Sequence, residues 1–322
     1  MSLILGLDSG GTKTLAALAD ESGRVVSLIG RASLDPSAGD GWKSALAGLL
    51  KDLPELPSVR SAVFGLPFHG EIEAVSAEQI RVVRELMPIE PVVDNDVRIA
   101  FDGAFAGEAG ALILAGTGSM AWASLAGPDD PHVRVGGWGD AFGDEGSAFW
   151  IGREALAATS RELDGRSPKT GFSQAVLSRL GVPPSGLLAW CYGTTSRRGA
   201  FASLAALVSE LADSGDATAR AILDRAAMDL TDTLIAAWRQ AAGERPLRWS
   251  YAGGVTASPY LMQSLRERVG CEPVHRRLPP IGGALYRAAI DAGWAVGPAW
   301  LERLERSLSE FPTTTETDNQ EA

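Results

Sequence analysis

The sequence predicts an α/β protein built from two similar domains. Its 322 residues are enough for two domains of ordinary size. A short apolar strand, a glycine-rich hairpin and a second strand occur at residues 3–19, and the same unit returns at residues 111–125. Elsewhere, apolar side chains recur at helical spacing. Because a repeated supersecondary unit indicates repeated architecture, we expect two α/β domains that each begin with a strand hairpin.

Strands and helices alternate in the first half of the chain. Short apolar runs predict strands at residues 3–7, 15–19, 25–29, 62–67 and 91–94. Trp42, Leu46 and Leu50 recur at helical spacing, and further helices are expected at residues 77–86 and 99–105. This alternation is typical of an α/β domain.

The second half opens with strands and continues mainly as helices. Strands are expected at residues 111–115, 120–125 and 247–252. A long amphipathic helix is expected to begin near Asp216 and to stop at Gly243 and Pro246. Shorter helices are expected at residues 151–156, 259–268, 283–292 and 298–308.

Charge and hydropathy exclude several classes of partner. Twenty-nine Lys and Arg against 40 Asp and Glu give a net charge of −11, which argues against binding nucleic acid or an anionic membrane through bulk charge. No apolar run reaches the roughly 18 residues of a membrane span. The apolar start is too short for a signal peptide, so the cytoplasm is the expected compartment. Residues 312–322 are expected to form a disordered acidic tail.

Cysteine and histidine usage gives no sign of a metal or disulfide framework. Cys191 and Cys271 are too few for a disulfide scaffold or a four-cysteine zinc site. The histidines at positions 69, 132 and 275 lie far apart and lack metal-ligand spacing. The unusual residue is glycine, with 37 copies where average usage of about 7% would give roughly 23. Because no periodic repeat explains the excess, particular turns must use these glycines.

The first glycine-rich hairpin is a candidate phosphate site. Glycines let backbone N–H groups approach phosphate oxygens, and nearby hydroxyls can add donors. Asp8 precedes the hairpin and can hold Mg²⁺, which prefers oxygen ligands. The spacing differs from a Walker A loop, and an ordinary hairpin is an equal alternative. The candidate residues are Ser9, Gly10, Gly11, Thr12, Lys13 and Thr14.

The second hairpin has the same chemistry. It carries Gly116, Thr117, Gly118 and Ser119. Two phosphate-type hairpins in one chain suit a nucleotide held between two domains, so together they favour phosphate binding over two unrelated turns.

A short acidic segment follows the expected strand at residues 91–94. Asp94, Asn95 and Asp96 stand at this strand end, directly before a helix. A carboxylate in this place can act as a general base that accepts the proton of an attacking hydroxyl. The alternative is a helix N-cap, for which Asp and Asn are favoured.

Residues 136–147 make a poor core segment and a good ligand loop. Five glycines, three acids and two aromatic residues occur within twelve positions. Aromatic side chains such as Trp138 can cover sugar faces, beside glycines such as Gly137. Asp144 and Glu145 can accept hydroxyl hydrogen bonds, or they can simply favour the start of the next helix.

Two further glycine pairs carry weaker signals. Gly253 and Gly254 follow the expected strand at 247–252, where bare backbone would admit a flat adenine ring, although a plain tight turn is equally good. Gly282 and Gly283 open another expected helix.

Taken in this order, the motifs resemble the actin-like sugar-kinase superfamily. Within it they are most similar to the N-acetylglucosamine kinase and BadF/BadG/BcrA/BcrD ATPase-like family. The resemblance runs from residue 3 to about residue 292. Its most specific element is Gly-Gly-Trp-Gly followed by Gly-Asp-Glu-Gly-Ser in residues 136–147, shortly after Gly-Thr-Gly-Ser.

The resemblance implies two RNase-H-like domains with ATP and Mg²⁺ in the cleft between them. The N-terminal domain would comprise residues 1–110, completed by the helix near 298–309. The C-terminal domain would comprise residues 111–297. Hinge closure, a homodimer and a small amino-sugar substrate are also implied.

Site residues follow from matching motifs. Asp8 and residues 10–14 match the first phosphate motif, and residues 116–119 match the second. Asp96 matches the catalytic base, which also lies at the sugar. Asp144 matches a sugar-binding carboxylate, with Gly137, Trp138 and Glu145 in the same loop. Gly253 and Gly254 match the adenosine motif.

The expected activity is transfer of phosphate from ATP to the C6 hydroxyl of N-acetylglucosamine. Asp35 stands where related kinases often carry Ser-Asn, and a carboxylate there would favour the ammonium of glucosamine. Glucosamine therefore remains an alternative substrate. An ATPase that activates a dehydratase is a second alternative, although it would need clustered cysteines for an iron–sulfur cluster. A sugar-responsive regulator would need an added DNA-binding region, and a binding protein without catalysis is a fourth alternative.

Overall fold

The computed structural model describes residues 2–11, 13–36, 39–125 and 131–311. Its internal contacts divide the chain into two units. The first comprises Met1–Ala109, Leu125–Asp130 and His275–Ala322, and the second comprises Gly110–Ser124 and Pro131–Val274. The sequence placed residues up to 297 in the second domain, whereas the chain returns to the first unit at His275. The expected tail, 312–322, lies outside the described residues.

A five-stranded sheet forms the centre of the first unit, in the order β3-β2-β1-β4-β5. β1, β2 and β3 are neighbours in antiparallel pairs, and β4 and β5 continue the sheet parallel to β1. The bounds are β1 (Leu3–Ser9), β2 (Lys13–Asp20), β3 (Val25–Ala32), β4 (Val59–Leu66) and β5 (Val92–Asn95).

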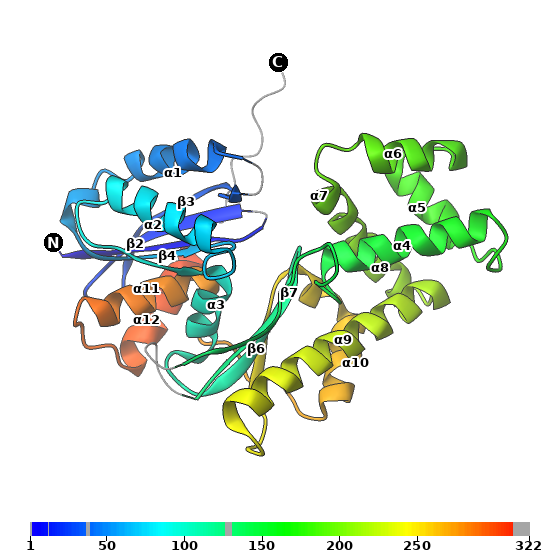
Figure 1. Ribbon diagram of the computed structural model, residues 1–322. Helices are drawn as coiled ribbons and strands as arrows, with labels where there is room; N and C mark the ends of the chain where they lie inside the picture. The colour runs from blue at the N-terminus through cyan, green and yellow to red at the C-terminus, as the bar shows by residue number, and fades with distance from the viewer. Residues whose placement is uncertain (1, 12, 37–38, 126–130, 312–322) are drawn as a thin grey trace. The chain divides into compact units, whose positions relative to one another are not determined.

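Helices cover both faces of this sheet, as Figure 1 shows. Successive side chains of a strand point to opposite faces. Leu5 and Leu7 therefore belong to one core, with α1 and α2, while Ile4 belongs to another, with α3, α11 and α12. This two-sided burial explains why β1 is apolar without alternation. The helices are α1 (Gly41–Lys51), α2 (Glu73–Leu86), α3 (Asp96–Phe105), α11 (Pro280–Asp291) and α12 (Pro298–Glu310), with a short 3₁₀ helix η2 (Leu56–Ser58).

The second unit repeats the plan of the first. Its sheet has the order β8-β7-β6-β9, with β6, β7 and β8 antiparallel and β9 parallel to β6. The bounds are β6 (Gly110–Ala115), β7 (Ser119–Ser124), β8 (Val133–Gly136) and β9 (Trp249–Ala252). The repeat expected from the two hairpins, and with it the α/β class, is therefore confirmed. β8 is not predicted from the sequence, because this four-residue strand is short and, in the described sheet, lies at the edge beside β7.

A long helix, α9, packs against strands β6, β7 and β8 of the second sheet. It begins where the Asp216 carboxylate accepts a hydrogen bond from Ala219 N at 2.8 Å, and it ends at Gly243. Its other neighbours are helices, among them α4, α8 and α10. The remaining bounds are α4 (Ala148–Leu163), α5 (Phe172–Leu180), η3 (Pro184–Gly186), α6 (Leu187–Gly193), α7 (Arg197–Ala202), α8 (Leu204–Asp213), α9 (Ala217–Ala242), η4 (Gly254–Ala257) and α10 (Pro259–Val269).

Gly282 and Gly283 serve helix packing rather than a ligand turn. A Cβ on Gly283 would lie 2.0 Å from the carbonyl oxygen of Ile99, so the backbones of α11 and α3 touch. A Cβ on Gly282 would meet Leu278 and Leu308 at 2.9 and 3.1 Å. These glycines let α11 pack closely on α3, and this contact helps return the chain to the first unit before residue 297.

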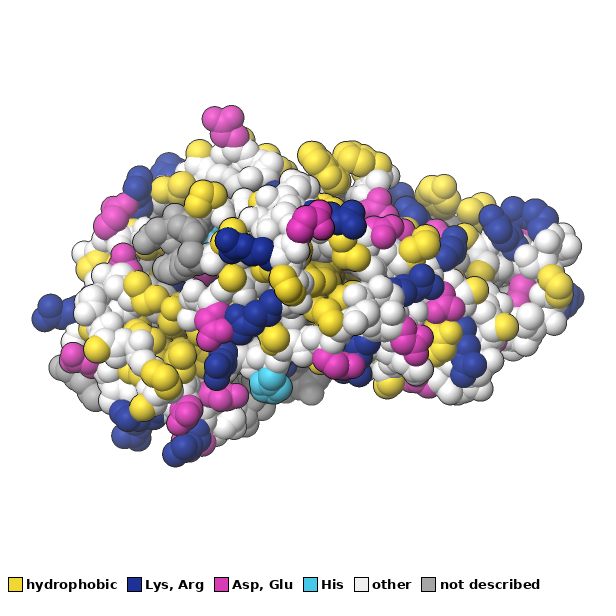
Figure 2. Space-filling view, turned by 90° about the horizontal axis from the view of Figure 1, so that it is seen from below, with side chains coloured by type: hydrophobic (Ala, Val, Ile, Leu, Met, Phe, Trp, Pro, Cys, Tyr) yellow, Lys and Arg dark blue, Asp and Glu magenta, His cyan; other side chains and the backbone are white. Residues whose placement is uncertain are grey.

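The face of the molecule seen in Figure 2 carries mixed charge. On the face shown in Figure 2, Lys and Arg side chains are interspersed with Asp and Glu rather than gathered into one basic area. No helix in the described part of the chain is both long and apolar enough to cross a membrane.

Candidate active site

The first hairpin closes tightly between β1 and β2. Gly10 N donates to Lys13 O at 3.1 Å. Gly11 and Lys13 are exposed, so both can meet a ligand, whereas Thr12 lies outside the described residues. The hairpin thus presents short, accessible backbone at the end of β1.

Two hydroxyls of this hairpin are used inside the sheet. Ser9 and Thr14 are fully buried and their hydroxyl oxygens lie 2.8 Å apart. Thr14 Oγ1 donates to Ala32 O at 2.9 Å, and Ser9 Oγ accepts from Leu34 N at 3.0 Å. The expectation that these hydroxyls bind phosphate therefore disagrees with the structure, in which Thr14 bonds the hairpin to β3 and Ser9 bonds it to the segment after β3.

The segment after β3 lies against the first hairpin. Ser33 Oγ donates to Gly10 O at 2.6 Å, and Leu34 N donates to Ser9 Oγ. Asp35 follows directly and is half-buried. The structure thereby places this carboxylate, which the sequence analysis assigned to the substrate, on the segment bound to the hairpin.

Two carboxylates stand beside the hairpin. Asp8 and Asp96 are both half-buried, and a Cβ on Gly10 would lie 3.9 Å from Asp96 Oδ2. Burial raises the pKa of Asp8 to about 7, which nearby Lys13 partly opposes. Burial, and then the charges of Asp8 and Glu71, raise the pKa of Asp96 to about 7. Carboxylates held close together in a poorly solvated place favour a proton or a cation.

The segment from Asp94 to Asp96 divides three roles among three residues. Asn95 is the N-cap of α3, because its Oδ1 accepts from Val97 N at 2.9 Å. Asp94 pairs with Arg287 of α11. Asp96 is the first residue of α3, and its Oδ1 also accepts from Val97 N, at 3.0 Å. Capping therefore falls to Asn95, and Asp96 Oδ2 faces the hairpin.

Glu71 is a candidate residue that the sequence analysis missed. Asn95 Nδ2 donates to Glu71 Oε1 at 3.0 Å and to His69 O at 2.8 Å. Phe68, at the start of this turn, has a φ of +63°, a conformation that non-glycine residues rarely adopt. The turn brings Glu71 close enough to raise the pKa of Asp96. The sequence signal for this candidate is limited to an acidic residue directly after Phe-His-Gly.

The second hairpin is covered by the start of α4. Ala148 N donates to Gly116 O at 2.8 Å and Phe149 N donates to Thr117 O at 3.3 Å. Ser119 Oγ donates to Glu145 O at 2.7 Å. Hairpin carbonyls thus accept from the first N–H groups of α4, and the Ser119 hydroxyl is already occupied.

Asp144 is the most constrained residue of the following loop. It is 3% exposed and has a φ of +57°. Its Oδ2 accepts from Arg198 Nη2 at 2.9 Å, and its Oδ1 lies 3.5 Å from Ser119 N. Burial raises the pKa of Asp144, and the Arg198 guanidinium works against that rise. Strained backbone that a structure maintains is typical of functional sites.

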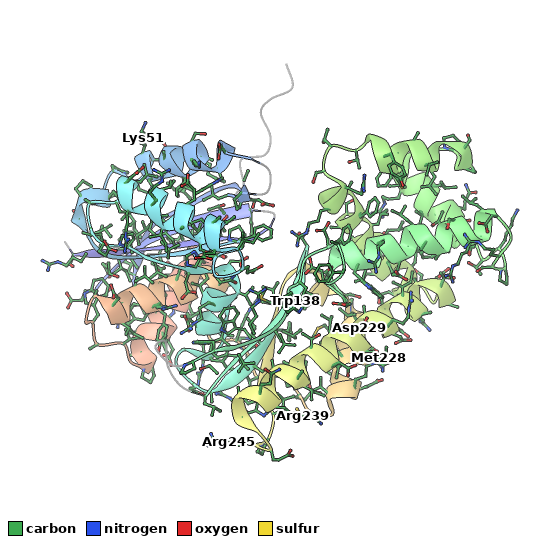
Figure 3. The ribbon with its side chains drawn as sticks, viewed as in Figure 1. Lys51, Trp138, Met228, Asp229, Arg239 and Arg245 are labelled. Carbon is green, nitrogen blue, oxygen red and sulfur yellow. The ribbon has the colours of Figure 1, made fainter. Side chains whose placement is uncertain are left out.

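The rest of the loop is open to solvent. Trp138, between β8 and α4, is 68% exposed (Figure 3), and Phe142 is 74% exposed. Gly137 has a φ of +68° and packs its backbone on Met120. Glu145 is exposed beside the buried Asp144, and the N-cap of α4 is Ser147, whose Oγ accepts from Trp150 N.

The glycine pair after β9 lies at the second hairpin. Gly253 has a φ of +98°, and a Cβ there would lie 2.3 Å from Ala115 O. Close backbone approach therefore requires this glycine. Gly254 has open space around it, so a ligand can reach its backbone.

Comparison with known proteins gives one family. The model of the BadF/BadG/BcrA/BcrD ATPase family matches residues 5–286. The N-acetylmuramic acid/N-acetylglucosamine kinase of Clostridium acetobutylicum is 27% identical over 241 residues, covering 71% of this chain and 77% of its own. The N-acetyl-D-glucosamine kinase of Dictyostelium discoideum is 26% identical over 252 residues, covering 72% and 78%.

A solved structure shares the fold. A protein from Chromobacterium violaceum assigned as an N-acetylglucosamine kinase superposes with a TM-score of 0.72 and 26% identity. The match covers 88% of this chain and 98% of that protein. The likeness therefore extends through both units rather than through one hairpin.

Proposed function

The chain belongs to the BadF/BadG/BcrA/BcrD ATPase family, and on that premise we propose that it is an amino-sugar kinase that uses ATP to phosphorylate the C6 hydroxyl of N-acetylglucosamine. The observation that carries the proposal is Asp96, a half-buried carboxylate at the start of α3 that faces the first glycine hairpin. The activity of the two curated relatives supports the choice of substrate.

The two hairpins suit the phosphates of ATP. Gly10 and Gly11 present backbone without side chains, and exposed Lys13 adds a positive charge. Gly116 and Gly118 form the corresponding hairpin of the second unit, where Arg198 lies beside Gly118 and Gly254 leaves open space for the base. In a protein of net charge −11, backbone N–H groups supply a binding surface that bulk charge does not.

Asp8 is the proposed magnesium residue. Among the described residues, no three His, Cys, Asp or Glu side chains gather closely enough to form a metal cage. Mg²⁺ in phosphoryl-transfer sites is usually held by one or two carboxylates together with substrate phosphates and water. A poorly solvated carboxylate such as Asp8, beside a phosphate hairpin, fits that type of site.

Asp96 is the proposed general base. When bound, ATP with magnesium supplies the phosphoryl group and offsets the charge that develops on it. Asp96 would accept the proton of the attacking C6 hydroxyl as its oxygen bonds to the γ-phosphorus and the bond from that phosphorus to the oxygen that leaves with ADP breaks. Asn95 fixes the start of α3, so the direction of the Asp96 side chain is set before substrate binds.

Asp144 and its loop are proposed to bind the sugar. The Asp144 carboxylate can accept hydrogen bonds from sugar hydroxyls, with Glu145 and the backbone of Gly137 nearby in sequence. Trp138 is exposed and can cover an apolar sugar face. A homodimer is part of the same proposal.

Cys191 lies on α6 and Cys271 follows α10, with no cysteine-rich segment around either, so the activator-type alternative lacks its cluster ligands.

ADP release measured over a panel of hexoses and hexosamines tests the proposed function. N-acetylglucosamine should raise turnover well above the ATP-only background, and chelation of Mg²⁺ should abolish the increase. A product analysis should place the phosphate on C6. If no sugar raises turnover above the background, the kinase assignment is wrong.

Replacement of Asp35 tests the choice between two sugars. If the Asp35 carboxylate reads the ammonium of glucosamine, Asp35→Asn should shift the ratio of kcat/KM values toward N-acetylglucosamine by about tenfold, because a charged hydrogen bond is lost for one substrate only. Glu21→Gln, an exposed carboxylate in the turn after β2, is the control. An unchanged ratio would remove Asp35 from sugar selection.

A further inference from the structure

An arginine that belongs to none of the sequence motifs contacts the loop of residues 136–147, which carries Asp144. Arg198, in α7, donates from Nη2 to Asp144 Oδ2 at 2.9 Å. The Asp144 side chain is 3% exposed and that of Arg198 is 28% exposed, so the pair is poorly solvated. A Cβ on Gly118 would lie 2.7 Å from Arg198 Nη2 and 2.8 Å from Asp144 Oδ2. The ion pair therefore lies directly over the second hairpin.

The packing of α7 explains how Arg198 reaches this place. A Cβ on Gly152 would lie 1.9 Å from Phe201 O, so α4 and α7 are in backbone contact. The Phe201 ring stacks on Phe149 at 5.7 Å and on Trp190 at 6.0 Å. Arg198 stands three residues before Phe201, on the same side of the helix. The packing of Phe201 thus fixes α7 in a position from which Arg198 reaches Asp144.

The same helix, α4, holds the other side of the arrangement. Its first N–H groups donate to the carbonyls of Gly116 and Thr117, and the loop that ends in α4 carries Asp144. The second hairpin, Asp144 and Arg198 are therefore all positioned by α4, the arginine through the packing of α7. This poorly solvated ion pair, held by packed helices, differs from a surface ion pair, which contributes little to stability because its side chains are mobile and hydrated.

We propose that Arg198 is a positioning residue for sugar binding that acts through Asp144, an inference that rests on the proposed kinase function. The guanidinium binds Oδ2 and holds the carboxylate in one orientation. A carboxylate offers about four acceptor positions, so acceptors remain for sugar hydroxyls. The guanidinium also opposes the rise in the pKa of Asp144 that burial causes, and so favours the ionised carboxylate. Helix α7 thereby contributes to sugar affinity.

The test compares two adjacent arginines. Arg198→Met keeps an apolar stem but removes the guanidinium. It should raise the sugar KM about tenfold, equivalent to about 1.4 kcal/mol, with the ATP KM and kcat within about twofold. Arg198→Lys should recover part of the affinity. Arg197→Met is the matched control, because Arg197 is exposed and lies over the Tyr192 ring, 5.3 Å from its centroid. Its sugar KM should stay within about twofold of wild type.

A double-mutant cycle tests whether Arg198 acts through Asp144. Asp144→Asn alone should weaken sugar binding, and adding Arg198→Met should weaken it no further, because the shared interaction is already lost. Sugar affinity from titration calorimetry on the same four proteins provides a readout that does not need turnover. The inference would be overturned if the two substitutions weakened sugar binding by factors that multiply in the double variant, or if Arg198→Met left the sugar KM unchanged. Wild-type protein without any sugar-dependent ADP release would instead show that the proposed function is wrong.

Discussion

Replacing Asp96 with asparagine should lower kcat at least about a hundredfold while the KM for ATP stays within about twofold. General bases contribute about 10²–10⁴-fold in rate, and an amide cannot accept the hydroxyl proton. The substitution keeps the size of the side chain. It also spares the N-cap of α3, since Asn95 performs that role. The measurement is coupled ADP release under saturating sugar and ATP.

A second carboxylate at a helix start provides the matched control. Glu73 is the first residue of α2 as Asp96 is of α3, but it is exposed, whereas Asp96 is half-buried. Glu73→Gln removes the same favourable charge from a helix N-terminus, which is worth about 0.3–1 kcal/mol of stability. It should leave kcat unchanged. Near-normal turnover in Asp96→Asn would exclude Asp96 as the base.

Features set by local sequence were predictable. Both hairpins, the strands beside them and α9 carry their own periodicity, glycines and caps within a few residues. The two sheets share a strand plan because the sequence repeats a unit that behaves alike in both places. The family was also predictable, from the Gly-Gly-Trp-Gly and Gly-Asp-Glu-Gly-Ser run, and the family match confirms it.

Features that depend on distant contacts were not predictable. Arg198 has no motif of its own, and its role follows from α7 packing on Gly152, 46 positions earlier in the chain. Ser9 and Thr14 looked like phosphate donors, since sequence does not reveal that their hydroxyls meet inside the sheet. For the same reason, Gly282 and Gly283 looked like a turn. Each case depends on which segment lies opposite, which a single sequence leaves open.

Gly283→Ala should destabilise the first unit by about 3 kcal/mol, although alanine is the better helix former by about 1 kcal/mol. The added Cβ would lie 2.0 Å from Ile99 O and 2.5 Å from Gly103 N, both backbone atoms that no rotamer change can move. Overlap therefore outweighs propensity, and α11 and α3 must separate. The unfolding transition of this unit should fall by roughly 6–12 °C.

The same substitution at Gly48 isolates the overlap. Gly48 is an exposed position within α1, and a Cβ there meets nothing within 4 Å. Gly48→Ala should stabilise the protein by about 0.5–1 kcal/mol, so the two variants should differ in sign. Because α3 begins with Asp96, displacement of α3 in Gly283→Ala should also move Asp96. The kcat of this variant should therefore fall even at temperatures at which it is folded, whereas the kcat of Gly48→Ala should not. Equal stabilisation by both alanines would mean that α3 and α11 do not pack in backbone contact, and that the position of Asp96 is set by β5 and its cap alone.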